Sequence, residues 1–138
     1  MIVRARWNAE IVQRLADGVA RGLAEFGVTD VETVSVPGSF EIPMAARAVA
    51  HSGRADAIVA IGAVIRGETT HYELVSEGAA EGLQQVQLTT GVPCAFGLVT
   101  VENEEQALAR SEGPGGHNVG EESALVAVEM ARLCQSWS

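Results

Sequence analysis

One segment of the chain combines residue types that suit the binding of a small anion. Residues 66–71 read Arg-Gly-Glu-Thr-Thr-His. Gly67 lets the backbone approach a ligand closely, and the hydroxyls of Thr69 and Thr70 can donate hydrogen bonds. A helix is predicted to begin near Thr70, and the free N–H groups of its first turn carry partial positive charge. The segment therefore predicts a phosphate or carboxylate site, although two threonines before a helix also suit ordinary capping.

His71 is the residue of this region best suited to acid–base chemistry. It falls in the first turn of the predicted helix, where the helix dipole favours a neutral imidazole that can accept a proton. The nearby Glu68 and Glu73 act in the opposite direction. A lone histidine is more often a solvated surface residue, so both interpretations stay open. His51 and His117 lack a comparable setting, and we expect them to be structural or exposed.

Residues 37–41, Pro-Gly-Ser-Phe-Glu, offer groups that suit a hydroxylated ligand. The segment follows a predicted strand. The Glu41 carboxylate and the Ser39 hydroxyl could bind sugar-type hydroxyls. A carboxylate in the first turn of a helix also stabilises that helix without any ligand, and the sequence alone slightly favours this second interpretation.

Three further side chains have both a structural and a functional interpretation. Trp7 could stack on a planar heterocycle, or it could anchor a core or an interface. Arg110 ends a short predicted helix, where it could clamp a phosphate or simply offset the helix dipole. Phe96 lies inside a predicted strand, and the pattern favours core packing for it.

Composition excludes several classes of protein. The chain has 138 residues, 9 basic against 18 acidic, and every basic residue is arginine. The missing lysine excludes Schiff-base chemistry on lysine, and the missing basic stripe argues against nucleic-acid binding. No apolar run approaches the roughly 20 residues of a membrane helix. No metal-site, dinucleotide or nucleotide motif occurs. The 2 cysteines exclude a disulfide scaffold and, with no signal peptide visible, favour the cytoplasm.

The elements that must position these residues alternate between strands and helices. Residues 57–65 form a continuous apolar run, which is typical of a strand covered on both faces. Strands are predicted at residues 2–5, 31–36, 57–65 and 93–101. Helices are predicted after Asn8 up to Gly27, at 42–51, at 70–87, from Asn103 to 110, and at 120–134. Both asparagines can cap the helices that follow them.

This order predicts one α/β domain, residues 1–138. We expect a three-layer α/β/α sandwich with a four-stranded parallel sheet in the flavodoxin-like order 2-1-3-4. Ligands of such sheets bind outside the carboxyl ends of the strands. All the segments described above, apart from Phe96 and Arg110, follow or end a predicted strand.

The same segments resemble the lumazine synthase family of riboflavin biosynthesis. The resemblance covers nearly the whole chain in order. It is carried by Arg-Trp-Asn at 6–8, Val-Pro-Gly-Ser-Phe-Glu-Ile-Pro at 36–43, Gly-Ala-Val-Ile-Arg-Gly-Glu-Thr-Thr-His-Tyr at 62–72, and Pro-Cys-Ala-Phe-Gly-Leu-Val-Thr-Val-Glu-Asn at 93–103. Asn-Val-Gly-Glu-Glu-Ser-Ala at 118–124 and Glu-Met-Ala at 129–131 complete it. The block at 62–72 is the most specific of these.

The resemblance implies a reaction that uses neither metal nor organic cofactor. 5-Amino-6-(D-ribitylamino)uracil condenses with 3,4-dihydroxy-2-butanone 4-phosphate, phosphate leaves, and the ring closes with loss of water. It implies His71 as the acid–base residue, and Trp7 against the pyrimidine in place of the family's usual phenylalanine. The other implied substrate contacts are Ser39, Phe40 and Glu41, then Ala63, Val64 and Ile65, and Phe96 lent by a neighbouring subunit. The implied phosphate site consists of Gly67, Glu68, Thr69 and Arg110, the last from a neighbour.

The resemblance also implies a homo-oligomer built on pentamers, with active sites at subunit interfaces. The chain begins almost directly at its first strand, so we expect a pentamer rather than a sixty-subunit shell. Pairing with riboflavin synthase stays open. Two features depart from the family pattern: Val119 stands where many relatives carry lysine, which His117 could partly replace, and the loop at 111–116 looks slightly longer.

Three alternatives remain. An assembly protein could keep the ring and lose the activity. A flavodoxin-like signalling domain would need a lysine beside its phospho-acceptor, and the chain has none. An archaeal-type riboflavin synthase would share the fold and differ in its product.

Overall fold

The apolar run at residues 57–65 forms a central strand of a parallel sheet. The computed structural model describes all residues, 1–138. Its four strands are β1 (Ile2–Ala5), β2 (Thr33–Val36), β3 (Ile58–Ile65) and β4 (Cys94–Val101), and they lie in the order β2-β1-β3-β4. Every neighbouring pair is parallel. The predicted strand order is therefore confirmed, and β3 lies between β1 and β4.

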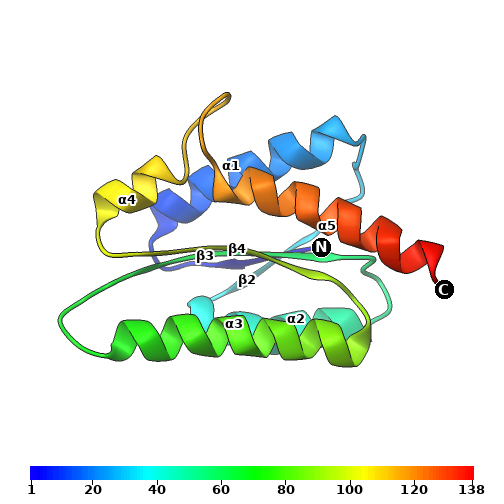
Figure 1. Cartoon of the computed structure of the whole chain (residues 1–138), viewed down its shortest axis with the longest axis horizontal. Coiled ribbons are helices and arrows are strands. Elements are labelled where there is room, and N and C mark those ends of the chain that lie inside the picture. Colours follow the sequence, from blue (N-terminus) through cyan, green and yellow to red (C-terminus); the bar gives the residue numbers. More distant parts are fainter.

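Helices cover both faces of this sheet, as Figure 1 shows. One layer holds α1 (Ala9–Glu25), α4 (Glu104–Ala109) and α5 (Val119–Ser136), and the other holds α2 (Ile42–His51) and α3 (His71–Thr90). A short 3-10 helix, η1 (Ser39–Glu41), leads into α2 and was not predicted. The predicted three-layer α/β/α architecture is confirmed.

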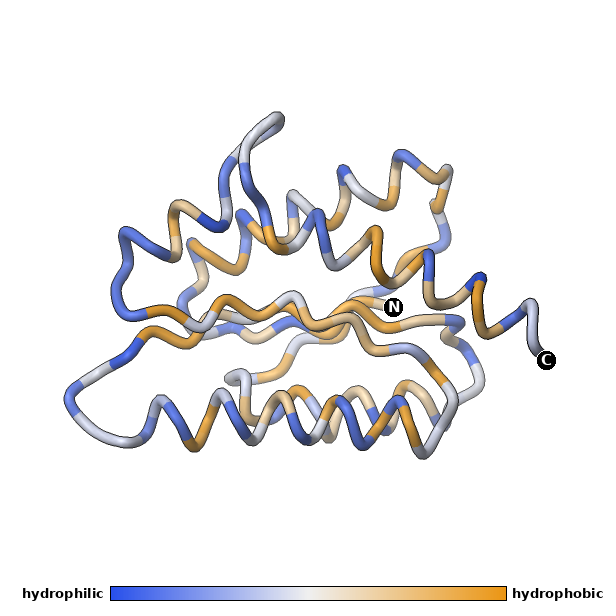
Figure 2. Tube along the Cα trace, in the orientation of Figure 1, coloured by the Kyte–Doolittle hydropathy of each residue, from blue (hydrophilic) through white to orange (hydrophobic).

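Each face of the sheet has its own apolar core. The core under α1, α4 and α5 includes Leu15, Val99 and Ala124. The core on the α2 and α3 side includes Ile42 and Leu83. Colouring by hydropathy shows the strands as largely apolar, whereas the helices alternate between apolar and polar positions (Figure 2). This pattern is the one expected for a sheet buried between two helical layers.

Several element boundaries match the predictions, and others do not. Gly27 and Gly91 follow α1 and α3 with positive φ angles of 68° and 75°, the conformation in which helices commonly stop. Asn103 caps α4 by accepting a hydrogen bond from the Gln106 N–H at 2.9 Å. Strand β2 begins at Thr33 rather than at residue 31. Asn8 makes no side-chain cap for α1, so that prediction was wrong.

No helix of the chain combines the length and the apolar character that crossing a bilayer requires.

Candidate active site

A pocket of about 370 Å³ opens where β1 and β3 end. This is the carboxyl edge of the sheet, where parallel α/β sheets bind their ligands. The pocket is lined by Ala5, Trp7, Asn8, Ser39, Phe40, Glu41, Ala63, Val64, Ile65, His71, Leu74 and Val75. The structure thus brings together the predicted site residues of three separate segments of the chain.

Trp7 forms an aromatic wall of the pocket. Its side chain is 64% exposed, and its backbone N–H donates to the Pro37 carbonyl at 3.0 Å. The indole lies against Gly38, where an added Cβ would come within 2.5 Å of the ring. Gly38 therefore makes room for the indole, and one face of an apolar ring stays open to a ligand.

Helix η1 supplies polar groups to the same pocket. The Gly38 N–H donates to Oε2 of Glu41 at 3.0 Å, which closes the turn and fixes the carboxylate. Ser39 is only 5% exposed, and its hydroxyl has no hydrogen-bond partner within the chain. An unpartnered buried hydroxyl is costly, and a polar ligand in this pocket is one way to satisfy it. Gly62 on β3 is needed here, because a Cβ would come within 2.5 Å of the Ser39 oxygen.

The remaining walls come from β3, Phe40 and α3. Ala63, Val64 and Ile65 form the end of β3. Phe40 packs its ring on α3 at Gly78, where a Cβ would approach the ring within 2.8 Å. These groups leave a slot with apolar walls and a few polar atoms, which suits a flat heterocycle bearing a hydroxylated chain.

His71 begins α3 and lines the same pocket. Its backbone N–H donates to Oγ1 of Thr69 at 3.3 Å. The loop that holds Gly67, Glu68 and Thr69 precedes it directly and is exposed. An imidazole beside exposed N–H groups of a helix start can exchange protons close to a bound anion.

Arg66, at the start of this loop, is held by contacts within the chain. It forms ion pairs with Glu73 and, at 2.8 Å, with Glu102, and its guanidinium lies 4.3 Å from the centre of the Tyr72 ring. The hydrogen bond from Arg66 lowers the pKa of the Glu73 carboxyl below its usual value. The Arg66 charge is therefore matched by two carboxylates within the same chain.

Five predicted site residues lie outside the lining of the pocket: Gly67, Glu68, Thr69, Phe96 and Arg110. Phe96 is 42% exposed on β4, an edge strand, so the core packing that its pattern favoured was wrong. Arg110 follows α4, and its guanidinium donates to the Gln106 carbonyl at 3.0 Å.

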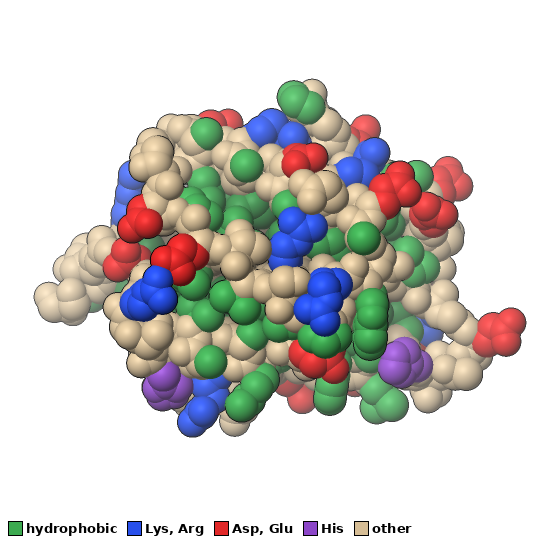
Figure 3. Space-filling model, turned by 180° about the vertical axis from the view of Figure 1, so that it is seen from behind, with side chains coloured by type: hydrophobic (Ala, Val, Ile, Leu, Met, Phe, Trp, Pro, Cys, Tyr) green, Lys and Arg blue, Asp and Glu red, His purple; other side chains and the backbone are tan.

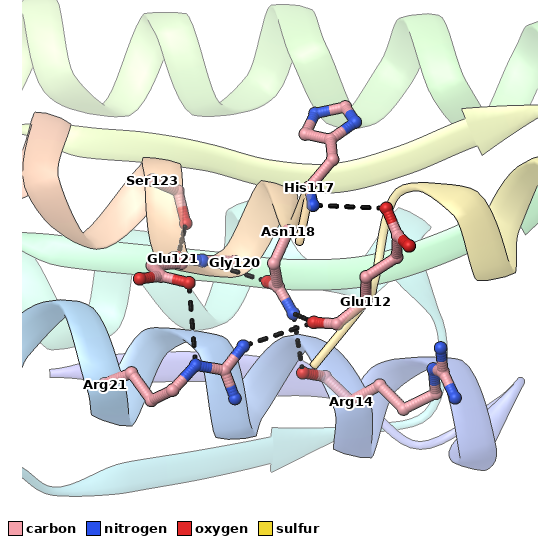
Figure 4. Close-up of polar contacts among 8 residues, drawn as sticks. All are labelled: Arg14, Arg21, Glu112, His117, Asn118, Gly120, Glu121 and Ser123. Carbon is pink, nitrogen blue, oxygen red and sulfur yellow. Dashed lines mark hydrogen bonds and ion pairs between the residues drawn. The ribbon is translucent and has the colours of Figure 1, made fainter. Parts of the chain in front are cut away.

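A buried asparagine fixes the loop that follows Arg110 (Figure 4). The Asn118 amide donates to the carbonyls of Arg14 at 3.1 Å and Glu112 at 2.9 Å, and its oxygen accepts from the Glu121 N–H at 3.0 Å. The Val119 N–H also donates to the Arg110 carbonyl at 2.9 Å. The predicted loop is thus a well-bonded turn that sets where Arg110 lies.

His117, which we expect could partly replace the missing lysine, lies at the end of this loop. Its Nε2 lies 3.2 Å from a Glu122 carboxylate oxygen, and the side chain is half exposed. It lies outside the lining of the pocket.

A larger hollow of about 750 Å³ lies at the opposite edge of the sheet, where β1 and β3 begin. Its lining includes Met1, Glu32 and Arg54, and the last two form an ion pair with each other. It contains none of the predicted site residues. The smaller pocket contains the histidine, carboxylate and hydroxyl groups that acid–base chemistry and ligand binding require, so we take it as the candidate active site.

Four lining residues were not predicted as site residues: Ala5, Asn8, Leu74 and Val75. Leu74 and Val75 come three and four positions after His71 on α3, so helical spacing alone could have placed them on its face. Asn8 adjoins Trp7, but its role depends on a contact with a distant strand.

Comparison with known proteins identifies the family. The family model described as 6,7-dimethyl-8-ribityllumazine synthase matches residues 1–135. A protein of that name from Xanthomonas campestris pv. campestris (strain B100) is 48% identical over 137 residues, which cover 98% of this chain and 88% of that protein. One from Kineococcus radiotolerans is 49% identical over 129 residues, covering 93% and 80%. One from Halorhodospira halophila is 47% identical over 134 residues, covering 96% and 85%. The chain therefore belongs to the 6,7-dimethyl-8-ribityllumazine synthase family.

Proposed function

We propose that the pocket at the ends of β1 and β3 is where this chain makes 6,7-dimethyl-8-ribityllumazine. The chain is a transferase of riboflavin biosynthesis that condenses 5-amino-6-(D-ribitylamino)uracil with 3,4-dihydroxy-2-butanone 4-phosphate. An imine forms between the amine and the ketone, inorganic phosphate leaves, and the second ring closes with loss of water. The pocket needs to hold two small molecules in register and to move protons between them.

The observation that carries this assignment is the convergence of Trp7, Ser39 and His71 on one slot. The open indole face of Trp7 takes the flat pyrimidine ring. The unpartnered Ser39 hydroxyl and the carboxylate of Glu41 bind the ribityl hydroxyls, while Phe40 and residues 63–65 enclose the ring and chain. These contacts match an aromatic face, a hydroxyl and a carboxylate to the corresponding parts of one substrate.

The phosphorylated substrate binds beside His71. Backbone N–H groups of Gly67 and Glu68 and the Thr69 hydroxyl hold the phosphate, and Arg110 of a neighbouring subunit clamps it. His71 takes and returns protons as the imine forms and phosphate departs. Arg66 is matched by carboxylates, so the charge that opposes the phosphate comes from Arg110.

We propose a pentamer-based homo-oligomer, in which Phe96 of one subunit closes the pyrimidine site of the next. Large apolar side chains reach the surface of the subunit: Trp7, Phe40, Met44, Leu74, Leu88, Phe96 and Trp137 are among them. Figure 3 shows apolar groups spread over one face, many of them toward the layer of α2 and α3. Exposed apolar surface on this scale supports burial between subunits.

We further propose that residues 1–138 act as one domain in the cytoplasm. The two cysteines are unpaired, Cys94 buried and Cys134 exposed, which suits a reducing compartment. We also propose physical association with riboflavin synthase, which co-purification tests.

The assay that tests the function mixes the purified protein with both substrates and follows lumazine absorbance together with phosphate release. Equal amounts of lumazine and phosphate are expected. A folded protein that releases neither would overturn the enzyme assignment and leave an assembly protein. A riboflavin product in place of the lumazine, identified by mass, would show the related synthase instead.

A further inference from the structure

Asn8 has an unusual backbone conformation for its position. It follows Trp7 and precedes α1, and it is the sole non-glycine residue of the chain with a positive φ, at 58° with ψ at 47°. This left-handed conformation is unfavourable for most L-residues and is best tolerated by asparagine, aspartate and glycine. The side chain caps no N–H of α1. Something other than helix capping must therefore account for this conformation.

The Asn8 side chain bonds to a strand far away in the sequence. Its Nδ2 donates to the Ala63 carbonyl at 2.9 Å. A carbonyl can only accept, so the amide nitrogen must face it. Asn8 thereby joins the segment after β1 to the end of β3.

The Ala63 carbonyl lies where the β1–β3 ladder has already ended. The last paired residues are Arg4 and Ile61. Val59 donates its N–H to the carbonyl of Met1, the residue before β1, and alternate residues of a strand point to the same neighbour, so Ile61 and Ala63 face this side too. Asn8 supplies with its side chain the bond that the next rung of the ladder would have supplied.

Trp7 and Ala63 both line the active-site pocket, and Asn8 is the polar link between them. Pro37 and Gly38 hold Trp7 on its other side. We propose that Asn8 is a positioning residue that fixes the Trp7 indole at a set distance from the end of β3, which sets the width of the slot for a planar heterocycle. This inference rests on the proposed function, in which the uracil ring occupies that slot.

Substitution of Asn8 by glycine and by aspartate separates this positioning role from any role of Asn8 in stabilising α1. The first turn of α1 is bonded through the Asn8 carbonyl, which accepts from the Val12 N–H at 3.0 Å. Asn8→Gly keeps that carbonyl and the left-handed conformation and removes the link. Asn8→Asp keeps the shape, but a carboxylate cannot donate to Ala63 and repels its carbonyl.

The ligand-free test follows Trp7 by fluorescence. The chain has 2 tryptophans, and Trp137 near the carboxyl terminus is exposed and far from the pocket in sequence. Trp137→Phe therefore leaves Trp7 as the only reporter. In that background Asn8→Gly and Asn8→Asp should lower the time-resolved anisotropy of Trp7 and raise its quenching by acrylamide. Asn103→Gly, which removes a true helix cap elsewhere, should change neither.

The kinetic test measures KM for each substrate separately. Loss of one positioning bond should raise KM for the ribitylaminouracil about three- to tenfold, with aspartate at the upper end, and leave KM for the phosphorylated substrate unchanged. Unchanged Trp7 anisotropy in both variants, or equal rises in both KM values, would overturn the proposal. So would wild-type behaviour of Asn8→Asp, because the bond would then be dispensable.

Failure of the proposed substrate contact can be told apart from failure of this inference. Trp7→Ala with an unchanged KM for the ribitylaminouracil would remove Trp7 from the substrate site. The anisotropy of Trp7 in the ligand-free protein would still report whether Asn8 holds it.

Discussion

Arg66 at the end of β3 and Glu73 in the first turn of α3 form an ion pair across the loop that we propose as the phosphate site. Glu102 after β4 contacts the same guanidinium at 2.8 Å. The pair therefore connects the beginning of α3 to two neighbouring strand ends. Its effect is to brace the loop 67–70, whose backbone N–H groups are then already in place for an anion.

This pair should make stability depend on pH in the acid range. The pKa of Glu73 is lowered, chiefly by its hydrogen bond to Arg66. Its contribution is thus present above the carboxyl's usual pKa and is lost as pH falls through the lowered value. Glu73→Gln should lower the melting temperature at pH 7, and the difference from the wild type should shrink toward pH 3. Thermal unfolding of both proteins between pH 3 and pH 7 measures this difference. A difference in melting temperature that stays constant with pH would contradict the prediction.

His71→Ala should reduce kcat by about 10²- to 10⁴-fold, the usual range for loss of an acid–base group. Because the side chain is exposed, the fold should be retained. His51→Ala is the matched control, since His51 is also exposed on a helix but lies outside the pocket. Lumazine formation at saturating substrate measures the effect. Wild-type kcat in His71→Ala would exclude the proposed proton transfer.

Arg110→Ala should raise KM for the phosphorylated substrate about tenfold or more and leave KM for the ribitylaminouracil unchanged. If Arg110 serves a neighbour's site, His71→Ala and Arg110→Ala subunits should complement each other. The assay uses the phosphorylated substrate well below the KM of the Arg110→Ala protein, where each variant alone has low activity. Refolding them together in equal amounts should restore roughly a quarter of the sites, since random mixing pairs intact residues with that frequency. No recovery in mixed oligomers would place Arg110 in its own subunit's site or outside any site.

Asn118→Ala should destabilise the protein by about 3 kcal/mol, because it removes three hydrogen bonds of a buried side chain, one of which caps α5. Asn103→Ala is the control and should cost about 1 kcal/mol, since it removes one exposed capping bond. Urea unfolding measures both. Equal losses in the two variants would show that burial of the Asn118 network adds little.

The two cysteines should differ in reactivity. Burial raises the pKa of the Cys94 thiol to about 11, whereas Cys134 is exposed. A thiol reagent at pH 8 should label Cys134 alone in the native protein and both residues in urea. The raised pKa also means that Cys94 contributes stability below its ordinary value of 9.0, and that this is lost as pH rises toward 11. Cys94→Ala should show a weaker loss of stability over that alkaline range, and an unchanged slope would contradict the assignment.

The sheet could be predicted because its signals are local and strong. The apolar run that becomes β3 is unbroken from Ile58 to Ile65, and all but the last of these residues are at least nine-tenths buried. Helices of sufficient length separate the strands, so parallel crossovers follow from chain geometry. The strand order then places the loops after β1 and β3 at one edge, which is how residues 6–8 and 66–71 could be expected together.

The site could be predicted only where a residue's function depends on its own segment. The exposure of Phe96 could not, because it depends on how far the helices extend over the face of β4, the edge strand, and no local pattern states that. The conformation of Asn8 could not either, since its partner Ala63 lies 55 residues away. In both cases the packing of segments that are distant in the sequence overrides what the local pattern predicts.

The outer side of β4 leaves an eight-residue strand without a neighbour in the sheet. Unpaired strand edges readily attract other polypeptides, and this one carries a bare aromatic ring beside it. A newly synthesised subunit is therefore at risk of misassociation for as long as it stays alone. In the homo-oligomer that we propose, rapid encounter with sister subunits would protect each copy from aggregation as well as complete its catalytic machinery, so the concentration of nascent chains would become part of how this enzyme matures.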